Sequence, residues 1–416
     1  MRVHIVGAGL AGLAAAVSLA AAGRRVTVYE SSGHAGGRCR SFHDSVLDAV
    51  IDNGNHLMMS GNRSAMAYLD EIGARDTLTG PAVAEFPFVD LDSGARWTVR
   101  PNAGPIPWWI LCAGRRPPAS RARDFLAALR LRSAPPTATV EEVLGGSGSL
   151  YETFWEPLAV AALNTPAAQA AAQPLWQVLT ETFAHGAASC RPLVARKGLS
   201  ASLVDPALER LAALGADIRF SHRLKTVQTR DNLVTHLEFT ETGVVVQPTD
   251  AVILALPPQG LKSVLPGVSV PEGSHAIVNV HYRLPSPVMA HGDVSLLGLV
   301  GGVAQWLFVR HDIASVTVSA ADDLADQAAE LIGDRVWTDV SRALELPSAP
   351  VPPFRVVKER RATFAQTPAA MLLRAKTQSS LANLCLAGDW TDTGLPATIE
   401  SAVRSGHAAA DAVLES

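Results

Sequence analysis

Three glycines near the start of the chain have the spacing of a phosphate-binding turn. An apolar run over residues 3–6 leads into the turn and the start of a helix, formed by Gly7, Gly9, Leu10, Ala11 and Gly12. Glycines in this pattern allow a tight turn, close approach of a pyrophosphate to the backbone and close packing of helix on strand. The free N–H groups and the dipole at such a helix start favour anions. The chemistry predicted here is the binding of a phosphate group.

A carboxylate follows at the distance that a dinucleotide requires. Glu30 comes directly after the next apolar run and stands 18 residues after Gly12. At the end of a second parallel strand, a carboxylate accepts hydrogen bonds from ribose hydroxyls. The same negative charge repels a 2′-phosphate and disfavours NADP. The sequence therefore predicts a dinucleotide site, and the alternative is a glycine turn without a ligand.

Two further motifs, about 350 residues apart, carry residues suited to a phosphate-bearing cofactor. Gly36 and Gly37 expose backbone N–H groups, and Arg38 supplies a planar cation that binds phosphate. Near the C-terminus, an apolar run ends in Gly388 and Asp389. These motifs resemble those of the amine oxidase and phytoene desaturase flavoprotein superfamily, in which they complete one FAD site. A surface ion pair is the alternative role for Arg38 and Asp389.

The resemblance implies a role for each part of this site. It implies that Asp389 contacts the ribityl or pyrophosphate region of FAD. It places Thr398 and Ile399 at a helix start beside the isoalloxazine ring, where the helix dipole stabilises negative charge at N1–C2=O of reduced flavin. It also implies that the adenine meets the backbone near Val227.

The order of predicted strands and helices indicates an α/β fold with a discontinuous first domain. We expect a Rossmann-like FAD-binding domain of the glutathione-reductase type, built from residues 1–75, 198–262 and 355–416. The remaining segments, 76–197 and 263–354, are expected to build an α+β substrate-binding domain. A Pro/Arg-rich segment at 114–136 is predicted to be a loop.

Three stretches narrow the resemblance within the superfamily. They are Asp52–Asn62, Lys358–Phe364 and Gly388–Thr391. Together they resemble the squalene-associated flavoproteins, the hydroxysqualene dehydroxylases, and the likeness runs through nearly the whole chain. It implies FAD-dependent removal of the hydroxyl of hydroxysqualene, with hydride from reduced flavin N5, giving squalene for hopanoid-type lipids.

The implied reaction needs a group that helps the hydroxyl to leave. An allylic hydroxyl leaves poorly unless it is protonated or hydrogen-bonded, so a general acid beside the flavin is expected. His56 and Asp52 are the candidates, with a loop-tying histidine and a turn-forming aspartate as the alternative roles. Trp390 is a candidate aromatic face for the developing cation, with simple core packing as its alternative. Lys358 is expected to be either a holder of water near N5 or an ordinary surface lysine.

Composition limits the class of protein. The 416 residues carry a formal net charge of −4, 48% are hydrophobic and 18% are charged, which excludes intrinsic disorder and argues against nucleic-acid binding through bulk positive charge. The mean hydropathy is +0.17, yet the apolar runs are about ten residues long, too short to cross a bilayer. The four cysteines form no Cys-x-x-Cys pair, so no metal site or disulfide framework is predicted. With no signal peptide apparent, we expect a cytoplasmic protein.

One segment predicts contact with a membrane. Residues 105–111 are apolar and aromatic, and residues 115–132 hold six arginines and one aspartate, a local net charge of +5. An aromatic wedge beside positive charge suits an anionic membrane surface and gives a water-insoluble isoprenoid a route of entry. A solvated basic helix beside core tryptophans is the alternative. The prediction is peripheral contact with the inner membrane face.

Several functions remain open on the sequence alone. A carotenoid or phytoene-type desaturase and an amine oxidase would use the same cofactor, and FAD does not set the direction of electron flow. A non-catalytic isoprenoid-lipid carrier of the same fold would bind no flavin. One dinucleotide fingerprint is present, so the sequence names no site for an electron donor.

Overall fold

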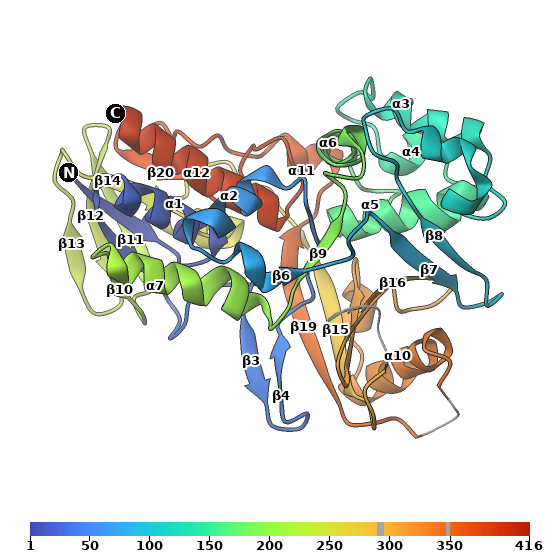
Figure 1. Ribbon diagram of the computed structural model, residues 1–416. Helices are drawn as coiled ribbons and strands as arrows, with labels where there is room; N and C mark the ends of the chain where they lie inside the picture. Colours follow the sequence, from blue (N-terminus) through green and yellow to red (C-terminus); the bar gives the residue numbers. More distant parts are fainter. Residues whose placement is uncertain (289–294, 347–349) are drawn as a thin grey trace.

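The nucleotide-binding motifs lie on a five-stranded parallel sheet. The computed structural model describes residues 1–288, 295–346 and 350–416 (Figure 1). The strand order is β10-β2-β1-β14-β20, and all four neighbouring pairs are parallel. The strands are β1 (Arg2–Val6), β2 (Arg25–Tyr29), β10 (Asp217–Arg219), β14 (Ala251–Leu254) and β20 (Leu384–Leu386). The sheet therefore draws on three distant segments of the chain.

Helices cover one face of this sheet. They are α1 (Leu10–Ala21), α2 (Arg63–Glu71), α7 (Asp205–Ala213) and α12 (Ile399–Glu415). Every residue of α1 from Leu10 to Val17 is buried, which fits a helix of nearly continuous apolar sequence packed between the sheet and α12. A Cβ on Gly406 would lie 2.3 Å from the carbonyl oxygen of Ala11, so α12 can approach α1 this closely only with glycine at that position.

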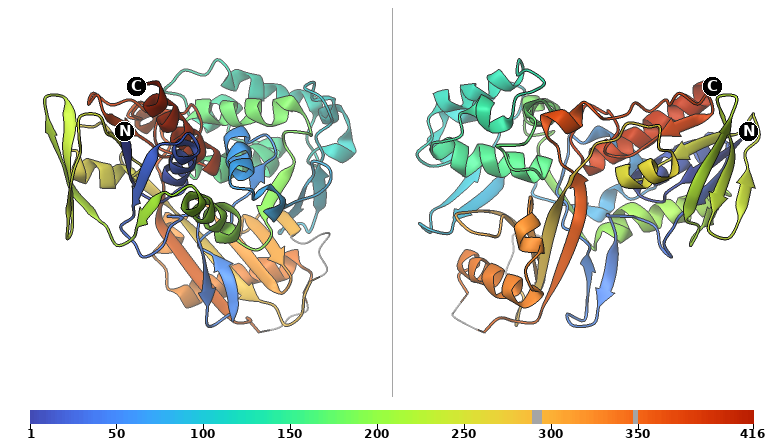
Figure 2. Two further views of the ribbon diagram at one scale, coloured as in Figure 1. Left: turned by 60° about the vertical axis from the view of Figure 1, so that its left-hand side comes forward. Right: turned by 180° about the vertical axis from the view of Figure 1, so that it is seen from behind.

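A small antiparallel sheet covers the other face. It consists of β11 (Leu224–Arg230), β12 (Leu233–Phe239) and β13 (Gly243–Val245), and it lies beside the two chain termini (Figure 2). Strand β1 serves both layers because its side chains alternate: Val3 and Ile5 pack under the helices, whereas Val6 packs with the small sheet. The result is a three-layer domain.

The second large sheet has seven strands in the order β19-β15-β18-β17-β16-β7-β8. Its strands are β7 (Phe86–Asp90), β8 (Arg96–Val99), β15 (Ser274–Arg283), β16 (Ser295–Val300), β17 (Trp306–Arg310), β18 (Ile313–Val318) and β19 (Phe354–Phe364). Helices α9 (Asp322–Ala325) and α10 (Ala329–Ala343) pack against it around an apolar core. Within this sheet, β7 and β16 are the parallel pair among otherwise antiparallel neighbours.

A helical region stands at the end of the molecule away from the termini (Figure 1). Its α-helices are α3 (Ala128–Leu131), α4 (Val140–Leu144), α5 (Glu156–Leu163) and α6 (Ala172–Glu181), with 3-10 turns at Trp108–Leu111, Ala113–Arg115 and Ala122–Ala127. An aromatic cluster that includes Trp109, Phe125 and Phe154 forms its core. The predicted loop at 114–136 therefore contains helical turns, because Phe125 and Leu131 supply the apolar contacts that hold them.

Short elements join these parts. They are β3 (Ser41–Asp44), β4 (Ala49–Asp52), β5 (Met58–Met59), β6 (Leu78–Thr79), β9 (Pro192–Ala195), α8 (Pro258–Val264), α11 (Pro368–Met371), 3-10 turns at Arg75–Thr77 and Phe183–His185, and π-helical turns at Tyr151–Trp155 and Ser200–Val204. Strands β3 and β4 form a hairpin that projects from the body (Figure 2).

The architecture confirms the predicted fold class, an α/β Rossmann-like domain with an α+β second part. The proposed segment 355–416 begins inside β19, and this strand pairs with β15 of the seven-stranded sheet, so its hydrogen bonds assign it to the second part. The proposed segment 263–354 includes residues 289–294 and 347–349, which lie outside the described residues. No helix within the described ranges is long and apolar enough to span a membrane.

Candidate active site

The glycine turn connects β1 to α1 in a strained, close-packed geometry. Gly7 has φ +107°, which favours glycine, and a Cβ on Gly12 would lie 1.9 Å from the carbonyl oxygen of Gly7. At Gly9, by contrast, nothing lies within 4 Å of the Cβ position, so a ligand can reach the backbone there. Helix α1 begins at Leu10 without a side-chain cap, which leaves the N–H groups of its first turn, at Leu10 and Ala11, available to an anion.

The second glycine pair lies directly against this turn. The Gly36 N–H donates to the carbonyl oxygen of Ala8 at 2.8 Å, and Gly36 forms a parallel bridge with Gly9. Gly37 is exposed, and a Cβ on it would lie 3.4 Å from Cα of Gly9. The two loops together form one cradle of backbone, in which Gly9 and Gly37 carry no side chain that would block a phosphate.

Glu30 holds the two loops in place. One carboxylate oxygen accepts from the Ala8 N–H at 2.8 Å, and the other accepts from the Ser32 N–H at 2.9 Å and the Ser31 hydroxyl at 3.1 Å. A carboxylate offers about four acceptor positions, so one remains for a ribose hydroxyl. The predicted ribose contact stays a proposal, and the contacts present show that Glu30 also fixes the turn.

Arg38 and Asp389 meet across the site although 350 residues separate them. Their ion pair measures 2.9 Å between Nη2 and Oδ1, and Arg38 also donates to the carbonyl oxygen of Ala362. The Asp389 carboxylate raises the pKa of Arg38. Despite this pair, 40% of the Arg38 side-chain surface is accessible, so the guanidinium borders an accessible space. This is where a phosphate-bearing cofactor would contact it.

The first turn of helix α12 contacts the residue that pairs with Arg38: its Ser401 hydroxyl donates to the backbone oxygen of Asp389 at 3.2 Å. Thr398 is its N-cap, and its hydroxyl oxygen accepts from the Ser401 N–H at 3.2 Å, so the helix starts at Ile399. The Gly388 N–H donates to the Ser405 hydroxyl at 2.8 Å, which ties the end of β20 to the second turn of α12. The predicted residues Gly388, Thr398 and Ile399 therefore stand on one short connection between β20 and α12.

The position proposed for adenine is less directly marked. Val227 lies in β11, where it pairs with Leu237 of β12, and its side chain is buried with Tyr29 in the core beneath the small sheet. Tyr29 precedes Glu30, so Val227 lies on the side of the domain where the second strand ends. The contact of its backbone with adenine stays a proposal.

These features fit FAD. The open backbone at Gly9 and Gly37 suits a pyrophosphate, and Arg38 adds a cation at an accessible internal position. The uncapped α1 start and the α12 start supply helix N-termini for the phosphates and for the flavin ring. Among the described residues, no group of His, Cys, Asp and Glu side chains could hold a metal ion.

Asp52 is buried and accepts several hydrogen bonds. Its Oδ1 accepts from the Ser41 hydroxyl at 2.6 Å and from the Leu199 N–H at 2.8 Å, and its Oδ2 lies 3.4 Å from Nη2 of Arg310. These contacts join the β3–β4 hairpin, the start of the Ser200–Val204 turn and β17. Through them Asp52 ties the backbone just before the 53–56 segment to two other elements, and its predicted catalytic role stays a prediction.

His56 lies on the segment that follows Asp52 in the chain. Burial lowers the pKa of His56 to about 4; the nearby Asp52 carboxylate opposes this shift and Arg38 adds to it. Its Nε2 lies 3.9 Å from Sγ of Cys39, and the side chain is half-buried. At neutral pH the imidazole is therefore uncharged and keeps one N–H that can donate to a substrate hydroxyl.

Trp390 is buried beside the flavin motif. It is 1% exposed within the core beneath the small sheet, and its Nε1 donates to the carbonyl oxygen of Leu256 at 2.8 Å. These contacts match the core-packing role that the sequence left open. A cation-facing role for Trp390 stays a proposal without a contact that favours it.

Strand β19 presents different side chains to its two faces. The Lys358 ammonium donates to the carbonyl oxygen of Gln327, on the side of the sheet that α10 covers. Glu359 points the other way, and its Oε2 accepts from Nδ2 of Asn53 at 3.2 Å. Glu359 therefore contacts the 53–56 segment, and the sequence analysis did not name it as a site residue. Successive side chains of a strand point to opposite faces, so the position of Glu359 next to Lys358 was the signal that could have found it.

A buried polar network supports the 53–56 segment from below. The Asn55 amide donates to the Thr317 hydroxyl at 3.1 Å, and that hydroxyl donates to Oδ1 of Asn279 at 2.7 Å. The backbone N–H of Asn55 also donates to Asn279, at 3.3 Å. Asn279 and Thr317 lie in β15 and β18, so their place in the site follows from sheet pairing and carries no local sequence signal.

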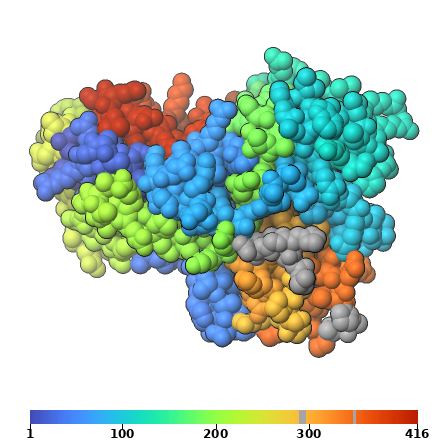
Figure 3. Space-filling view, viewed as in Figure 1, coloured from blue at the N-terminus to red at the C-terminus, as the bar shows by residue number. Residues whose placement is uncertain are grey.

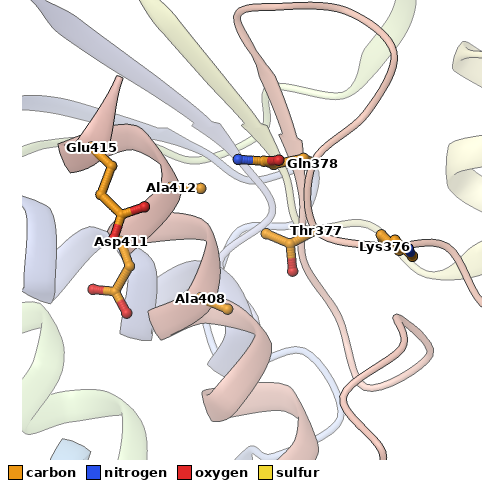
Figure 4. A pocket seen from close by; sticks show the side chains of 7 residues that line it. All are labelled: Lys376, Thr377, Gln378, Ala408, Asp411, Ala412 and Glu415. Atoms are coloured by element: carbon orange, nitrogen blue, oxygen red, sulfur yellow. The ribbon is translucent and has the colours of Figure 1, made fainter.

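Two surface hollows lie outside this site. One, of about 380 Å³, is lined by Lys376, Thr377, Gln378, Ala408, Asp411, Ala412 and Glu415, at the end of α12 far from Thr398 (Figure 4). The other, of about 560 Å³, runs along the outside of the 33–43 segment and includes Arg40, Phe42 and Lys197. Neither includes Gly9, Arg38 or Asp389, so neither is the cofactor cradle.

Comparison with known proteins agrees with this geometry. The model of the family described as flavin containing amine oxidoreductase matches residues 10–414. The hydroxysqualene dehydroxylase of Rhodopseudomonas palustris is 45% identical over 413 residues, which cover 99% of this chain and 98% of that protein. That of Zymomonas mobilis is 42% identical over 412 residues, with the same coverage. The structure of putrescine oxidase bound to putrescine is similar in fold, with a TM-score of 0.70 at 17% identity over 100% of this chain and 99% of that one.

The chain belongs to the flavin containing amine oxidoreductase family and is an FAD-dependent oxidoreductase. Within that family, three relatives that are 42 to 45% identical over 99% of the chain are hydroxysqualene dehydroxylases, so the resemblance stated from the sequence is confirmed. The predicted cofactor, FAD, is likewise confirmed.

Proposed function

We propose that this enzyme converts hydroxysqualene to squalene by FAD-dependent reductive dehydroxylation, for hopanoid-type lipid synthesis. The observation that carries the proposal is identity of 42 to 45% over 99% of the chain to proteins of that name. Likeness of this extent covers the seven-stranded sheet and the helical region as well as the nucleotide motifs. Both the cofactor part and the substrate part of those relatives are therefore matched.

The proposed reaction balances with one proton and one hydride. The substrate loses its hydroxyl as water: the leaving oxygen takes up one proton, which solvent supplies through the group that hydrogen-bonds it, and the carbon that carried it gains a hydride. Reduced FAD, when bound, supplies that hydride. Dry surroundings are needed because water would otherwise trap the allylic cation.

His56 is the residue that we propose to assist the departure of the hydroxyl. Because its pKa is about 4, it acts at neutral pH as a neutral N–H donor rather than as an imidazolium acid. Asp52 positions the segment that carries His56, through its bonds to Ser41 and Leu199. The proposed division of roles is thus one group that contacts the substrate and one that fixes its backbone.

Product analysis after a single anaerobic turnover tests the function. Enzyme with chemically reduced FAD is mixed with hydroxysqualene, and we expect about one squalene per flavin together with flavin oxidation. A His56→Phe variant, which has no side-chain N–H, is expected to slow squalene formation by about 100-fold while FAD binding is kept, the usual size of the loss of one positioned hydrogen-bond donor.

The same experiment separates the alternatives. Phytoene dehydrogenation by the oxidised enzyme, with no squalene from the reduced enzyme, would support a desaturase instead. Oxidation of a primary amine alone would support an amine oxidase. A colourless purified protein that binds isoprenoid without flavin would support the carrier.

We also propose that the enzyme is cytoplasmic and docks peripherally on the inner membrane face through its helical region. Five large apolar side chains there are between 46 and 75% exposed: Ile106, Trp108, Leu111, Leu126 and Leu129. Three of them, Trp108, Leu111 and Leu126, lie in 3-10 turns that pack on Trp109 and Phe125, whose ring centroids are 5.2 Å apart. The region forms the outer end of the molecule, at the upper right of Figure 3.

Positive charge surrounds these apolar side chains. Arg121, Arg130 and Arg132 are exposed and form no ion pair with other described residues. Arg115 stacks over the ring of Trp108 at 4.9 Å, and Arg116 donates to the carbonyl oxygens of Ile110 and Ser120, so Arg116 holds the fold of this region. The free arginines are the ones suited to anionic lipid headgroups.

Liposome flotation with anionic vesicles tests this surface. Replacing Arg121, Arg130 and Arg132 by Gln removes three charges worth about 1 kcal/mol each near such a surface, so binding is expected to fall by about 100-fold. The matched control is a triple replacement of Arg25, Arg210 and Arg335 by Gln, in other parts of the molecule. Equal flotation of the test variant and the wild type would contradict membrane docking.

A further inference from the structure

One buried arginine touches the flavin motif without belonging to it. Arg374 follows α11 and is 8% exposed. Among the described residues no carboxylate forms an ion pair with it, and burial lowers its pKa. Its guanidinium lies over the ring of the buried Phe364 at 5.8 Å. A charged group in such surroundings is costly unless all its donors are satisfied.

The donors of Arg374 are satisfied by one short loop. The guanidinium reaches five acceptors there: the backbone oxygens of Asp389 (3.4 Å), Trp390 (3.2 Å), Thr391 and Leu395 (2.7 Å), and the Thr393 hydroxyl (3.2 Å). The loop runs from β20 to α12 and contains no helix or strand. Its backbone course is therefore fixed by a side chain rather than by a hydrogen-bond ladder.

This arrangement decides which way the loop groups point. With its backbone oxygens turned toward Arg374, the loop leaves the Asp389 carboxylate free to pair with Arg38. The Asp389 backbone oxygen also accepts from the Ser401 hydroxyl at 3.2 Å, and that hydroxyl contacts the Thr393 hydroxyl at 2.6 Å. Hydrogen bonds from Arg374 and from the first turn of α12 thus hold the loop in place together.

We propose that Arg374 is a positioning residue of the FAD site. It holds the 389–395 loop so that Asp389 and the α12 start meet the cofactor, and its buried charge favours the reduced, anionic flavin over the oxidised form. The proposal rests on FAD binding alone and holds for any substrate of this enzyme. A planar fork with five N–H groups suits it, whereas the three donors of lysine cannot reach the same acceptors.

Two substitutions separate the effect of the hydrogen-bonding geometry of the Arg374 guanidinium from the effect of its positive charge. Arg374→Met removes both, and Arg374→Lys keeps the charge and loses the fork. The control is Arg96→Met, which removes a guanidinium bonded to the Ala343 carbonyl oxygen in the seven-stranded sheet. For each protein, the FAD dissociation constant is measured by titration of apoprotein, and the flavin reduction potential is measured at saturating FAD.

We expect the FAD dissociation constant to rise about 100-fold in R374M and about 10-fold in R374K, as several buried acceptors lose their donors. The potential should fall in R374M and stay near the wild-type value in R374K, because lysine restores the charge. R96M should match the wild type in both measurements.

An unchanged dissociation constant and potential in R374M would overturn the proposal, even if its thermal midpoint fell. An equal fall of potential in R374K and R374M would overturn the role of the charge. If R374M does not fold, R374K tests whether the guanidinium geometry of Arg374 is needed for FAD binding. A raised FAD dissociation constant in R374K supports this role, and a wild-type constant overturns it.

Discussion

The arginines of the flavin cradle and those of the helical region differ in what they contact. Arg38 and Arg374 are bound by a carboxylate and by backbone oxygens inside the molecule. Arg121 and Arg130, at the outer end, are exposed and without an ion pair among the described residues. The same residue type therefore fixes a cofactor loop in one region and stays available for a partner in the other. Burial and local acceptors decide between these uses.

The largest effect is expected from breaking the Arg38–Asp389 pair. Arg38→Ala leaves the buried Asp389 carboxylate without its partner, a cost of about 3 kcal/mol or more, and removes a cation from the cofactor cradle. We expect purified R38A to contain little flavin, read from the ratio of absorbance at flavin and protein bands.

The matched control for R38A is Arg360→Ala. Arg360 forms an exposed pair with Asp326, and such pairs contribute about 0–1 kcal/mol. R360A should therefore keep its flavin. Full flavin content in R38A would show that Arg38 is as dispensable for FAD binding as the exposed Arg360, and would contradict a cofactor-binding role for Arg38.

The next effect concerns His281, a buried histidine of β15 whose Nδ1 contacts the Ser315 hydroxyl at 2.8 Å. Burial lowers the pKa of His281 to about 4, below the 6.5 of an exposed histidine. Because the folded-state pKa is the lower one, its stabilising contribution is complete above pH 6.5 and is lost as the pH falls from 6.5 to 4. The shift corresponds to roughly 3 kcal/mol.

Urea unfolding at pH 7 and pH 4.5 measures this contribution. His281→Gln, which can still contact the Ser315 hydroxyl, should lose about 2–3 kcal/mol less than the wild type over that interval. His56→Gln should show a difference of similar size, because burial lowers the pKa of His56 to about 4 as well. Identical pH dependence in H281Q and the wild type would be evidence against a neutral buried imidazole.

A smaller effect is expected from the apolar part of the outer surface. Replacing Ile106 and Leu111 by Ser should weaken vesicle binding by about 10-fold, because only part of each side chain would enter the lipid boundary. The residual binding of this variant should vanish in 1 M salt, whereas wild-type binding should persist in part. Binding that is insensitive to both changes would separate the exposed apolar residues from membrane contact.

The smallest effect is expected on the far face of β19. Lys358→Met removes one bond to the Gln327 carbonyl oxygen, so we expect stability within about 0.5 kcal/mol and turnover within about 2-fold of the wild type. Glu359→Gln, on the opposite face, should change turnover more, because it alters the contact with Asn53 in the site. A larger loss in K358M than in E359Q would reverse the assignment of the two faces.

Local patterns in the sequence determined the parts of the molecule that depend on neighbouring residues. The glycine turn at Gly7–Gly12, the helix after it and Glu30 are set by backbone sterics over about 25 residues, and all three appear in the structure where they were expected. Resemblance to known flavoproteins placed the motifs of Arg38 and Asp389 in one site, which no local pattern could give. The positive charge of residues 115–132 could likewise be predicted, because the density of charged residues is read directly from the sequence.

Only the tertiary structure decided the contacts that cross elements. Strand pairing set the faces of Lys358 and Glu359, and it brought Asn279 and Thr317 beneath the 53–56 segment. The role of Arg374 depends on backbone oxygens, which every residue carries and which therefore leave no mark in the sequence. A sequence records side-chain types at each position, whereas the distance between positions far apart along the chain exists only once the chain has folded.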